Sequence, residues 1–600
     1  MDQMWPRGFP LEFIKDHNNG ANRQILCQKM RRSSVQQGLV HHDPDVDAIY
    51  RLIHADTKTG LDVGFNKYAP SILLAPGTYS PWNSQNTLFH KSAFHILMLP
   101  MSVSFRTTDI WRSFFAQKIL HLSGLTVSFT PVNAVQFRNS HDFLKDFRDE
   151  SQVYSDSGKI LQFLDAWNCS YQKIEDCMKE LAKDFVKNEF WGEDDEKLID
   201  LYIQDLIQVN FKFPGIRENQ DSYEASENET EFNVNCRRAN FEFSLTQKKS
   251  QEKLNNFGDI SDWCEESNFT KLADFPSAQD LSQAHQNDYV LQKHQQNVLL
   301  IVNNWPWKFG IGHLQRLYQP YFASVVFCGS YYPEEYQNSS QQGFGETQNP
   351  FNFIHINPTE IYRGFLGYHC LTLLHEVGLQ NIEGYIFMAD DAHFNIWQRI
   401  DFTRVFHVVG MDVPTSKGWW TNPVYGTPAA KRIISEIQNT TDTEKLEAWK
   451  KFETGLRTFG YISPNQTAAD DLLSGKGRSV SDFFYIPKSE IDYYSTIMRI
   501  FFENKLFLEL AVNRFIRSVR HQTSNLRATS YLWGNRGKWP EVYNVNMVAM
   551  HPLKLSAFKF PNENRRKYCE KILKPWHEIL FKKSGNYTVK MDDEPDYMNG

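Results

Sequence analysis

The sequence has no cysteine pair spaced as CxxC, no excess of basic residues and no long apolar run. The spacing of its eight cysteines excludes a zinc ribbon and a CxxC redox motif. A net charge of −7, without a clustered Lys/Arg stripe, argues against a nucleic-acid partner. No stretch approaches the roughly 18 apolar residues of a membrane span, and the beginning lacks a signal-peptide pattern. Either the protein is cytosolic, or the amino-terminal part of a longer protein is missing.

The composition is that of a large globular chain. At about 100–200 residues per domain, 600 residues predict two to four domains. An aromatic content of 14% is compatible with large cores and with carbohydrate sites, and does not separate the two. The even cysteine number is compatible with disulfides. N-x-S/T sequons are compatible with a secretory lumen, or arise by coincidence in polar loops. They begin at Asn168, Asn228, Asn268, Asn338, Asn439, Asn465 and Asn586.

Three regions follow one another along the chain. Residues 1–150 mix short strands, turns and a helix. Residues 151–296 begin with amphipathic helices and become a polar connector. Residues 297–600 alternate apolar strands with helices, which predicts a mainly parallel sheet covered on both faces. The fold class is therefore α/β.

Within the third region the expected elements can be placed. A buried helix is expected over residues 363–377, and a long helix over about 489–519. Parallel sheets bind ligands at the carboxyl ends of their strands. The expected strands are 298–302, 324–328, 351–356 and 384–389.

The acidic pair Asp390–Asp391 is the strongest candidate for an active centre. An apolar strand ending at Ala389 delivers both carboxylates to its carboxyl end. Mg²⁺ and Mn²⁺ prefer such oxygen ligands, and a metal here would neutralise charge on a nucleotide diphosphate. Asp391 is also a candidate catalytic residue. The alternative is that Asp390 caps a turn and Asp391 is solvated.

A late segment, HPLKLS, offers a third metal ligand and a phosphate contact. His551 supplies an imidazole for the metal, and Lys554 a positive charge for phosphate. This interpretation requires both residues to meet the acidic pair. Otherwise His551 is an ordinary loop histidine.

Two further sets of residues complete the expected site. The loop after the first strand of a parallel sheet commonly contacts the nucleotide, which makes Asn303, Asn304 and Trp305 candidates for holding the base or ribose. Glu503 is the candidate general base, with Glu509 nearby as an alternative. Both glutamates are also compatible with solvated helix positions.

The first region contains acidic motifs of its own. HHDPDVDAIYR places Asp43, Asp45 and Asp47 at alternate positions, like a spaced acidic motif. Asp109 opens a helix, where it either caps the helix or faces a sugar. A purely structural role remains open for each of them.

Several motifs in order resemble the STELLO glycosyltransferase family. They are WPRGFPLEFI, QQGLVHHDPDVDAIYRL, APGTYSPWNSQNTLF and TTDIWRSFFAQ in the first region, with FMADDAHFNIW and HPLKLS in the third. The first region is also distantly similar to reversibly glycosylated polypeptides, which include UDP-arabinopyranose mutases. There, similar segments lie in the later half of a GT-A fold. The resemblance leaves the polar middle unassigned.

The resemblance implies two GT-A or Rossmann-like α/β units, the first of them partial, because its preceding nucleotide-binding half and its acidic motif are not in this chain. It implies a metal-dependent glycosyltransferase that uses Mn²⁺ or Mg²⁺, a nucleotide-sugar donor such as a UDP-sugar, and a glycan or glycoprotein acceptor. It further implies a Golgi membrane or lumenal location. Two alternatives remain. One is a catalytically inactive scaffold that assists a membrane-associated polysaccharide synthase or Golgi complex, and the other is a nucleotide-sugar mutase.

Overall fold

The computed structural model divides the chain into two compact units, described separately below. Unit 1 is Met1–Arg23, Cys27–Cys236 and Phe243–Thr246, and unit 2 is Gln24–Leu26, Arg237–Glu242 and Gln247–Gly600. The predicted connector over 151–296 is therefore divided between the units. The structure describes residues 4–14, 24–27, 33–56, 58–137, 142–216, 236–243, 249–303, 310–330, 346–408, 417–523, 529–532 and 535–582.

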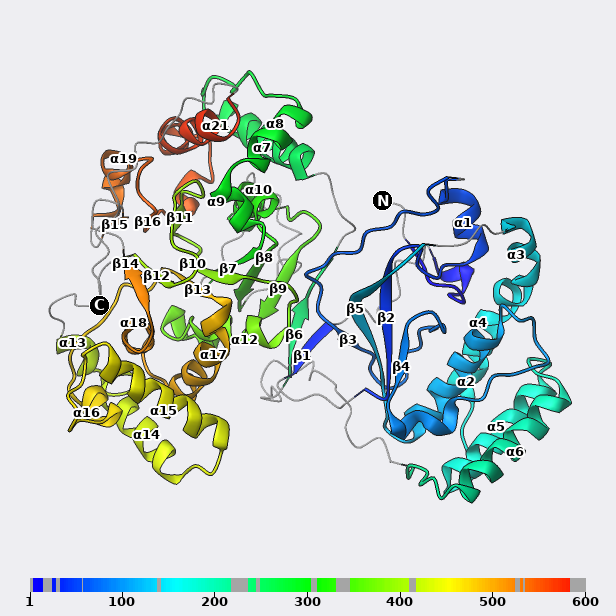
Figure 1. The fold of residues 1–600 in the computed structure, drawn as a ribbon. Helices are drawn as coiled ribbons and strands as arrows, with labels where there is room; N and C mark the ends of the chain where they lie inside the picture. The colour runs from blue at the N-terminus through cyan, green and yellow to red at the C-terminus, as the bar shows by residue number, and fades with distance from the viewer. Residues whose placement is uncertain are drawn as a thin grey trace. The chain divides into compact units, whose positions relative to one another are not determined.

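Unit 1 combines a four-stranded sheet with a layer of helices (Figure 1). The strand order is β3-β5-β2-β4, and only β2 and β5 run parallel. The strands are β2 (Val35–His42), β3 (Ile72–Leu73), β4 (Thr87–Phe89) and β5 (Val127–Gln136). The helices are α1 (Ala48–His54), α2 (Thr108–Leu122), α3 (Phe143–Asp149), α4 (Ser151–Ala166), α5 (Ile174–Lys187) and α6 (Glu193–Gln208). Short 3₁₀ helices lie at η1 (Leu11–Phe13) and η2 (Lys91–Ile96).

Helix α2 forms the centre of the unit 1 core. Most of its residues are buried, so other elements surround it on most sides. Trp111, Phe114 and Phe115 are buried along it. They belong to one hydrophobic cluster with residues of α4, α5 and α6. The helix that the sequence predicts to open at Asp109 is thus confirmed.

Unit 2 is built on a nine-stranded mixed sheet of order β1-β6-β9-β8-β7-β10-β13-β12-β14. Strands β9, β8, β7 and β10 are parallel, and β13 is antiparallel to β10. A three-stranded sheet has the order β11-β16-β15. The strands are β1 (Gln24–Cys27), β6 (Cys236–Asn240), β7 (Asn297–Asn303), β8 (Ser324–Gly329), β9 (Asn352–His355), β10 (Gly384–Ala389), β11 (His393–Phe394), β12 (Val405–His407), β13 (Phe483–Pro487), β14 (His521–Thr523), β15 (Thr529–Tyr531) and β16 (Ala549–His551).

Helices cover both faces of this sheet. Figure 1 shows α9 and α10 on one side of β7 and β10, and α12 and α17 on the other. The helices are α7 (Lys249–Glu265), α8 (Ala278–Gln286), α9 (Tyr289–His294), α10 (Ile311–Tyr318), α11 (Pro358–Ile361), α12 (His369–Glu376), α13 (Lys417–Trp420), α14 (Thr427–Asn439), α15 (Thr443–Thr458), α16 (Ala468–Leu473), α17 (Lys488–Glu503), α18 (Leu508–Arg517), α19 (Trp539–Val542), α20 (Glu563–Tyr568) and α21 (Lys574–Leu580). Short 3₁₀ or π turns are η3 (Gln319–Tyr321), η5 (Tyr362–Gly364), η6 (Arg536–Lys538), η7 (Leu555–Phe558) and η8 (Cys569–Leu573).

The central strands explain why their sequences are continuously apolar. Every residue of β7, β8 and β10 is buried, as expected for strands covered on both faces. On one face, Leu299 and Ile301 join a core that includes residues of α7, α10 and α21. The four predicted strands are found within a residue or two of their expected bounds. The predicted α/β fold is confirmed, and it is consistent with a Rossmann-like unit.

Two predicted helices differ from the structure. The long helix expected over 489–519 is two helices, α17 and α18, because Lys505 adopts a left-handed φ of 61° that ends α17. The helix expected over 363–377 begins only at His369. Arg363 and Gly364 also have positive φ, which no α-helix accommodates.

All eight cysteines form disulfides. The pairs are Cys27–Cys236, Cys169–Cys177, Cys264–Cys569 and Cys328–Cys370. Two of them join segments far apart in the chain, so they lower the entropy of the unfolded state. Among the described helices, none combines the length and the apolar character needed to cross a bilayer.

Candidate functional site at the carboxyl edge of the unit 2 sheet

The order of the parallel strands creates a switch point between β7 and β10. The chain proceeds from β7 to β8 and β9 on one side, and then returns to place β10 on the other. Ligands of open α/β sheets bind where the strand order reverses in this way. Asn303 ends β7, and Asp390–Asp391 follow β10 at the same edge. The backbone N–H of Asp390 donates to the Val302 carbonyl at 3.1 Å, which fixes the acidic pair to the end of β7.

A second strand pairing brings the late segment to the acidic pair. Strand β11, just after Asp391, pairs with β16, so that His393 lies opposite Met550. The Leu553 N–H also donates to the Asp391 carbonyl at 2.6 Å. His551 and Lys554 consequently both contact the Asp391 carboxylate. The His551 Nε2 lies 3.2 Å from Oδ1, and the Lys554 ammonium bonds to Oδ2.

A further carboxylate, Asp482, completes what we call the acidic cluster: Asp390, Asp391, Asp482, His551 and Lys554. Its Oδ1 lies 3.5 Å from His551 Nε2. Asp482 immediately precedes β13, and its carbonyl accepts a hydrogen bond from the Ala389 N–H at 2.8 Å. Sequence reasoning missed this residue. The available signal was an aspartate directly before the apolar strand FFYIP, and using it required knowing that this strand runs antiparallel to β10.

The electrostatics of the cluster are those of a buried ion-pair network. Burial raises the pKa of Asp391, but the hydrogen bond and charge of His551, together with Lys554, outweigh it and hold the pKa well below its ordinary value. Burial lowers the pKa of His551, but Asp482 and Asp391 outweigh it, so the net shift is upward. Burial raises the pKa of Asp482. The histidine therefore favours its charged form between two carboxylates.

The two candidate bases are in different surroundings. Glu503, at the end of α17, is ion-paired with Lys445 at 2.6 Å, and its carboxylate is two-fifths exposed. Glu509, in the first turn of α18, is buried, and its Oε2 has no hydrogen-bond partner in the described part of the chain. Burial, followed by the charge of Asp482, raises the pKa of Glu509 well above its usual range. Glu509 is therefore near enough to Asp482 for their charges to interact, whereas Glu503 contacts the Lys445 side chain.

The nucleotide contacts expected after β7 are described only in part. Asn303 is buried at the end of β7, beside Gly329 of β8, where any larger residue would collide with the Asn303 carbonyl. Within the described ranges, its Oδ1 has no hydrogen-bond partner. Asn304 and Trp305 lie outside the described residues. Asn303 thus presents an amide at the switch point, next to the acidic pair.

The acidic cluster contains carboxylate and imidazole groups of the kinds that bind metal ions, but the ammonium of Lys554 occupies one Asp391 oxygen. Neighbouring ligands in an octahedral Mg²⁺ shell lie about 3 Å apart. The separations of His551 Nε2 from Asp391 and Asp482, 3.2 and 3.5 Å, are of this order. Over the residues that the structure describes, no three Asp, Glu, His or Cys side chains are grouped so that they could hold a metal ion. In this structure the Lys554 ammonium, not a metal ion, is paired with Asp391 Oδ2.

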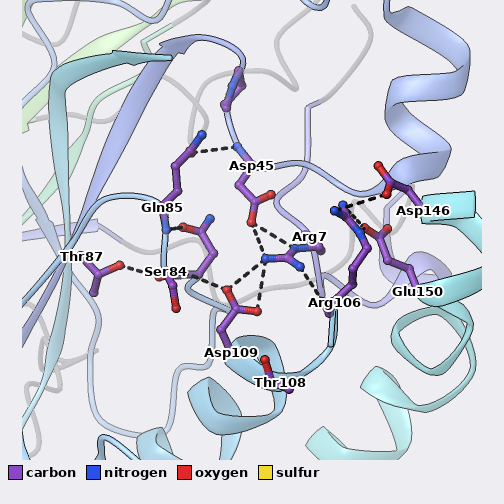
Figure 2. A network of polar contacts seen from close by, with 12 residues as sticks. Arg7, Asp45, Ser84, Gln85, Thr87, Arg106, Thr108, Asp109, Asp146 and Glu150 are labelled. Carbon is purple, nitrogen blue, oxygen red and sulfur yellow. Dashed lines mark hydrogen bonds and ion pairs between the residues drawn. The ribbon is translucent and has the colours of Figure 1, made fainter. Parts of the chain in front are cut away.

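The acidic motifs of unit 1 have a different environment. Figure 2 shows Arg7 between Asp45 and Asp109. Its Nη2 lies 2.7 and 3.0 Å from their carboxylates. Asp43 pairs with Arg51 at 3.1 Å. Asp47 caps α1 by accepting the Tyr50 N–H, and it also accepts the indole N–H of Trp5. Each of these carboxylates is thus bound to a group of its own unit.

A family model, described as STELLO glycosyltransferases, matches residues 106–483, which is more than half of the chain. The chain belongs to the STELLO glycosyltransferase family. The STELLO match includes Asp390, Asp391 and Asp482, whereas His551 and Lys554 lie beyond it. Glycosyl transfer is accordingly the general activity that the family indicates.

Two curated STELLO proteins of Arabidopsis thaliana are similar to this chain. "Probable glycosyltransferase STELLO1" is 32% identical over 212 residues, which is 35% of this chain and 27% of the relative. "Probable glycosyltransferase STELLO2" is 31% identical over the same shares. The matched stretch spans about a quarter of the length of these STELLO relatives.

Proposed function

We propose that this chain is a metal-dependent glycosyltransferase that uses a nucleotide-sugar donor, such as a UDP-sugar, at the acidic cluster. The observation that carries the proposal is the contact of His551 and Lys554 with Asp391 at the switch point of the sheet. Such switch points bind nucleotides in open α/β folds. Membership of a glycosyltransferase family supplies the reaction class. The acceptor is a glycan or a glycoprotein.

Each group of the cluster has a distinct proposed role. Asp390, Asp391 and His551 hold Mn²⁺ or Mg²⁺, which when bound neutralises charge on the leaving diphosphate. Lys554 leaves Asp391 and pairs with a phosphate oxygen, since it is flexible and 44% exposed. Asn303 hydrogen-bonds the nucleoside through its buried amide.

The proton of the acceptor hydroxyl requires a base, if the reaction inverts configuration. The sequence favoured Glu503, with Glu509 as the alternative. We assign the role to Glu509, because it is buried beside Asp482 while Glu503 is engaged by Lys445. A carboxylate with a raised pKa is, in its ionised form, a stronger base than an ordinary one.

Donor binding tests the proposal directly. UDP-sugars are screened by thermal unfolding with and without Mn²⁺, using wild type, Asp391→Asn and the matched control Asp492→Asn, whose carboxylate is 91% exposed. A donor present at 100 times its dissociation constant stabilises the fold by about 2.7 kcal/mol. We expect this gain in wild type and in Asp492→Asn, only with Mn²⁺, and its loss in Asp391→Asn. Equal stabilisation of Asp391→Asn contradicts the proposed site.

We further propose a Golgi lumenal location. Disulfides persist in oxidising compartments, and all eight cysteines are paired. The sequon asparagines within the described residues, Asn168, Asn268, Asn439 and Asn465, are exposed, as glycan attachment requires. Treatment of the protein from a secretory host with an N-glycosidase should lower its apparent mass.

A second candidate function is a catalytically inactive scaffold that assists a polysaccharide synthase complex. The observation that favours it is the occupation of both Asp391 oxygens by His551 and Lys554. A scaffold of this kind keeps its cellular function in Asp391→Asn. A metal-dependent enzyme loses it.

A further inference from the structure

A group of partly exposed aromatic rings lies at the start of α18, beside Glu509. We call it the aromatic cluster. Phe507 packs edge-to-face on Phe365 and on Trp419, with 4.6 Å between centroids in each pair. Tyr425 contacts Phe365 at 5.7 Å and Tyr362 at 5.1 Å. The members are Tyr362, Phe365, Trp419, Tyr425 and Phe507, and none of them is fully buried.

Backbone hydrogen bonds hold these rings in place from three separate segments. The Leu508 N–H donates to the Phe365 carbonyl at 2.8 Å, and the Phe507 N–H donates to the Tyr425 carbonyl at 3.1 Å. A side chain at Gly426 would collide with the carbonyl of Trp419, so a glycine is needed where this loop folds back on α13. The rings therefore form a fixed surface, although they remain open to solvent.

A short loop connects the aromatic cluster to the acidic cluster. Arg478 places its guanidinium 4.8 Å from the ring centroid of Trp419. One residue later, the Ser479 N–H donates to the Glu509 carbonyl at 3.0 Å. Asp482 then contacts His551. Because Asp482 lies four positions after Arg478, the backbone distance between them is at most about 14 Å.

The other side of the aromatic cluster approaches the end of β7. Gly367 follows Phe365 by two residues, and a Cβ added there would lie 3.3 Å from the Val302 side chain. Val302 in turn accepts the hydrogen bond from Asp390. The segment that carries Phe365 thus packs against the end of β7, at the edge of the sheet where the donor is proposed to bind.

We propose that the aromatic cluster is the binding surface for the acceptor, and that the acceptor is an oligosaccharide. Sugar rings present flat C–H faces that pack on aromatic rings, and tyrosine and arginine supply hydrogen bonds to their hydroxyls. Arg478 and the exposed Arg363 provide such donors on this surface. An oligosaccharide lying on the rings directs its end toward Glu509 and Asp482. This assignment rests on the glycosyltransferase function proposed above.

Calorimetric titration of the purified chain with oligosaccharides, without donor or metal, tests the acceptor surface. The probes are hexasaccharides of β-linked glucose, xylose, mannose and N-acetylglucosamine. We expect at least one to bind, and Tyr362→Ala to weaken its binding by about tenfold. Tyr362→Phe keeps the stacking face and most of the affinity. Tyr362 is suited to the test because it is 42% exposed, so that its removal leaves the core intact.

A matched control is Tyr289→Ala, which removes a tyrosine 57% exposed on α9, the helix that precedes β7. It should bind the hexasaccharide like wild type. Trp419→Ala should repeat the loss seen for Tyr362→Ala. Absence of binding by all four hexasaccharides, or equal binding by wild type and Tyr362→Ala, overturns the acceptor surface.

Donor binding separates this proposal from the one on which it rests. Tyr362→Ala should bind a UDP-sugar with Mn²⁺ as wild type does, because its ring belongs to the acceptor surface. If wild type binds no donor but binds a hexasaccharide through Tyr362, the glycosyltransferase function fails and the carbohydrate surface stands. If donor binding is intact and the hexasaccharides bind independently of Tyr362, the acceptor surface alone fails.

Discussion

The two units each contain a group of buried carboxylates, and the groups differ in the cations that accompany them. In unit 1, Asp45 and Asp109 share Arg7, whose side chain is 9% exposed. In unit 2, Asp391 is paired with His551 and with Lys554, which is 44% exposed. A guanidinium enclosed by two carboxylates is fixed, whereas an ammonium on an exposed flexible stem can move. The comparison therefore distinguishes a structural ion-pair network in unit 1 from a cluster in unit 2 whose carboxylate can exchange its ion-pair partner.

The unit 1 network joins segments that are far apart in sequence. Arg7 precedes β2, Asp45 follows it, and Asp109 opens α2 (Figure 2). The Ser84 N–H also donates to Asp109 at 2.9 Å. Burial lowers the pKa of Arg7, but Asp45, Asp109 and Glu150 outweigh it and raise the pKa above its usual value. The arginine therefore stays charged, and its role is to hold these segments together.

Removal of Arg7 is the largest change that we predict. Arg7→Met leaves Asp45 and Asp109 buried without their shared cation, which costs about 3–5 kcal/mol of unfolding free energy. Urea unfolding followed by circular dichroism measures the loss. The matched control is Arg148→Met, an exposed arginine of α3, which should stay within about 0.5 kcal/mol of wild type. A small effect of Arg7→Met would show that this network is not structural.

Sequence patterns could identify only those residues of each group whose positions follow from their neighbours in the chain. The apolar strand before Asp390–Asp391 placed the pair at a sheet edge, because burial on both faces leaves a continuous apolar run. The arrival of His551 depends on pairing of β11 with β16, more than 150 positions apart, and periodicity carries no information on such pairing. The predicted role of His551 therefore required it to lie near Asp390–Asp391, and the sequence alone could not show that it does.

The spaced aspartates of the first region show the reverse case, in which a sequence pattern suggests a ligand site although its carboxylates pair with groups of the protein. Asp43, Asp45 and Asp47 look like a ligand motif in sequence, yet they point to three different partners, which are Arg51, Arg7 and the start of α1. Alternate positions of a regular strand would share one face, but these residues lie in the irregular connection between β2 and α1, where their side chains diverge. Arg7, Arg51 and the cap of α1, none of which the spacing of the aspartates reveals, decide that these carboxylates are structural.

Acid should destabilise unit 1 through a buried histidine, while the Arg7 network is unchanged. Burial lowers the pKa of His95 to about 4. Unfolded chains protonate this histidine near pH 6.5, so its stabilising contribution is complete above that pH and is lost as the pH falls toward 4. Between pH 7 and pH 5 we expect the unfolding free energy of His95→Phe to fall by about 2 kcal/mol less than that of wild type.

Urea unfolding of wild type, His95→Phe and Arg7→Met at pH 7 and pH 5 measures this difference. The cost of Arg7→Met should not increase between pH 7 and pH 5, because arginine stays charged at both pH values. Exposed His54 provides the matched control, and His54→Phe should keep the wild-type pH dependence. An unchanged acid response of His95→Phe would assign the sensitivity to another group.

Removal of Lys554 has the smallest expected effect on stability and tests the other half of the comparison. Because Lys554 is 44% exposed, its ion pair with Asp391 contributes at most about 1 kcal/mol, and His551 remains to pair the carboxylate. Lys554→Met should therefore unfold close to wild type while binding the UDP-sugar about tenfold more weakly, since the phosphate loses its cation. Lys431→Met, at an exposed position of α14, should change neither quantity. If Lys554→Met costs as much stability as Arg7→Met and leaves donor affinity unaltered, the acidic cluster is a structural network like that of unit 1. If Lys554→Met lowers donor affinity without lowering stability, the exposed lysine is what makes the buried carboxylates of unit 2 available to a ligand.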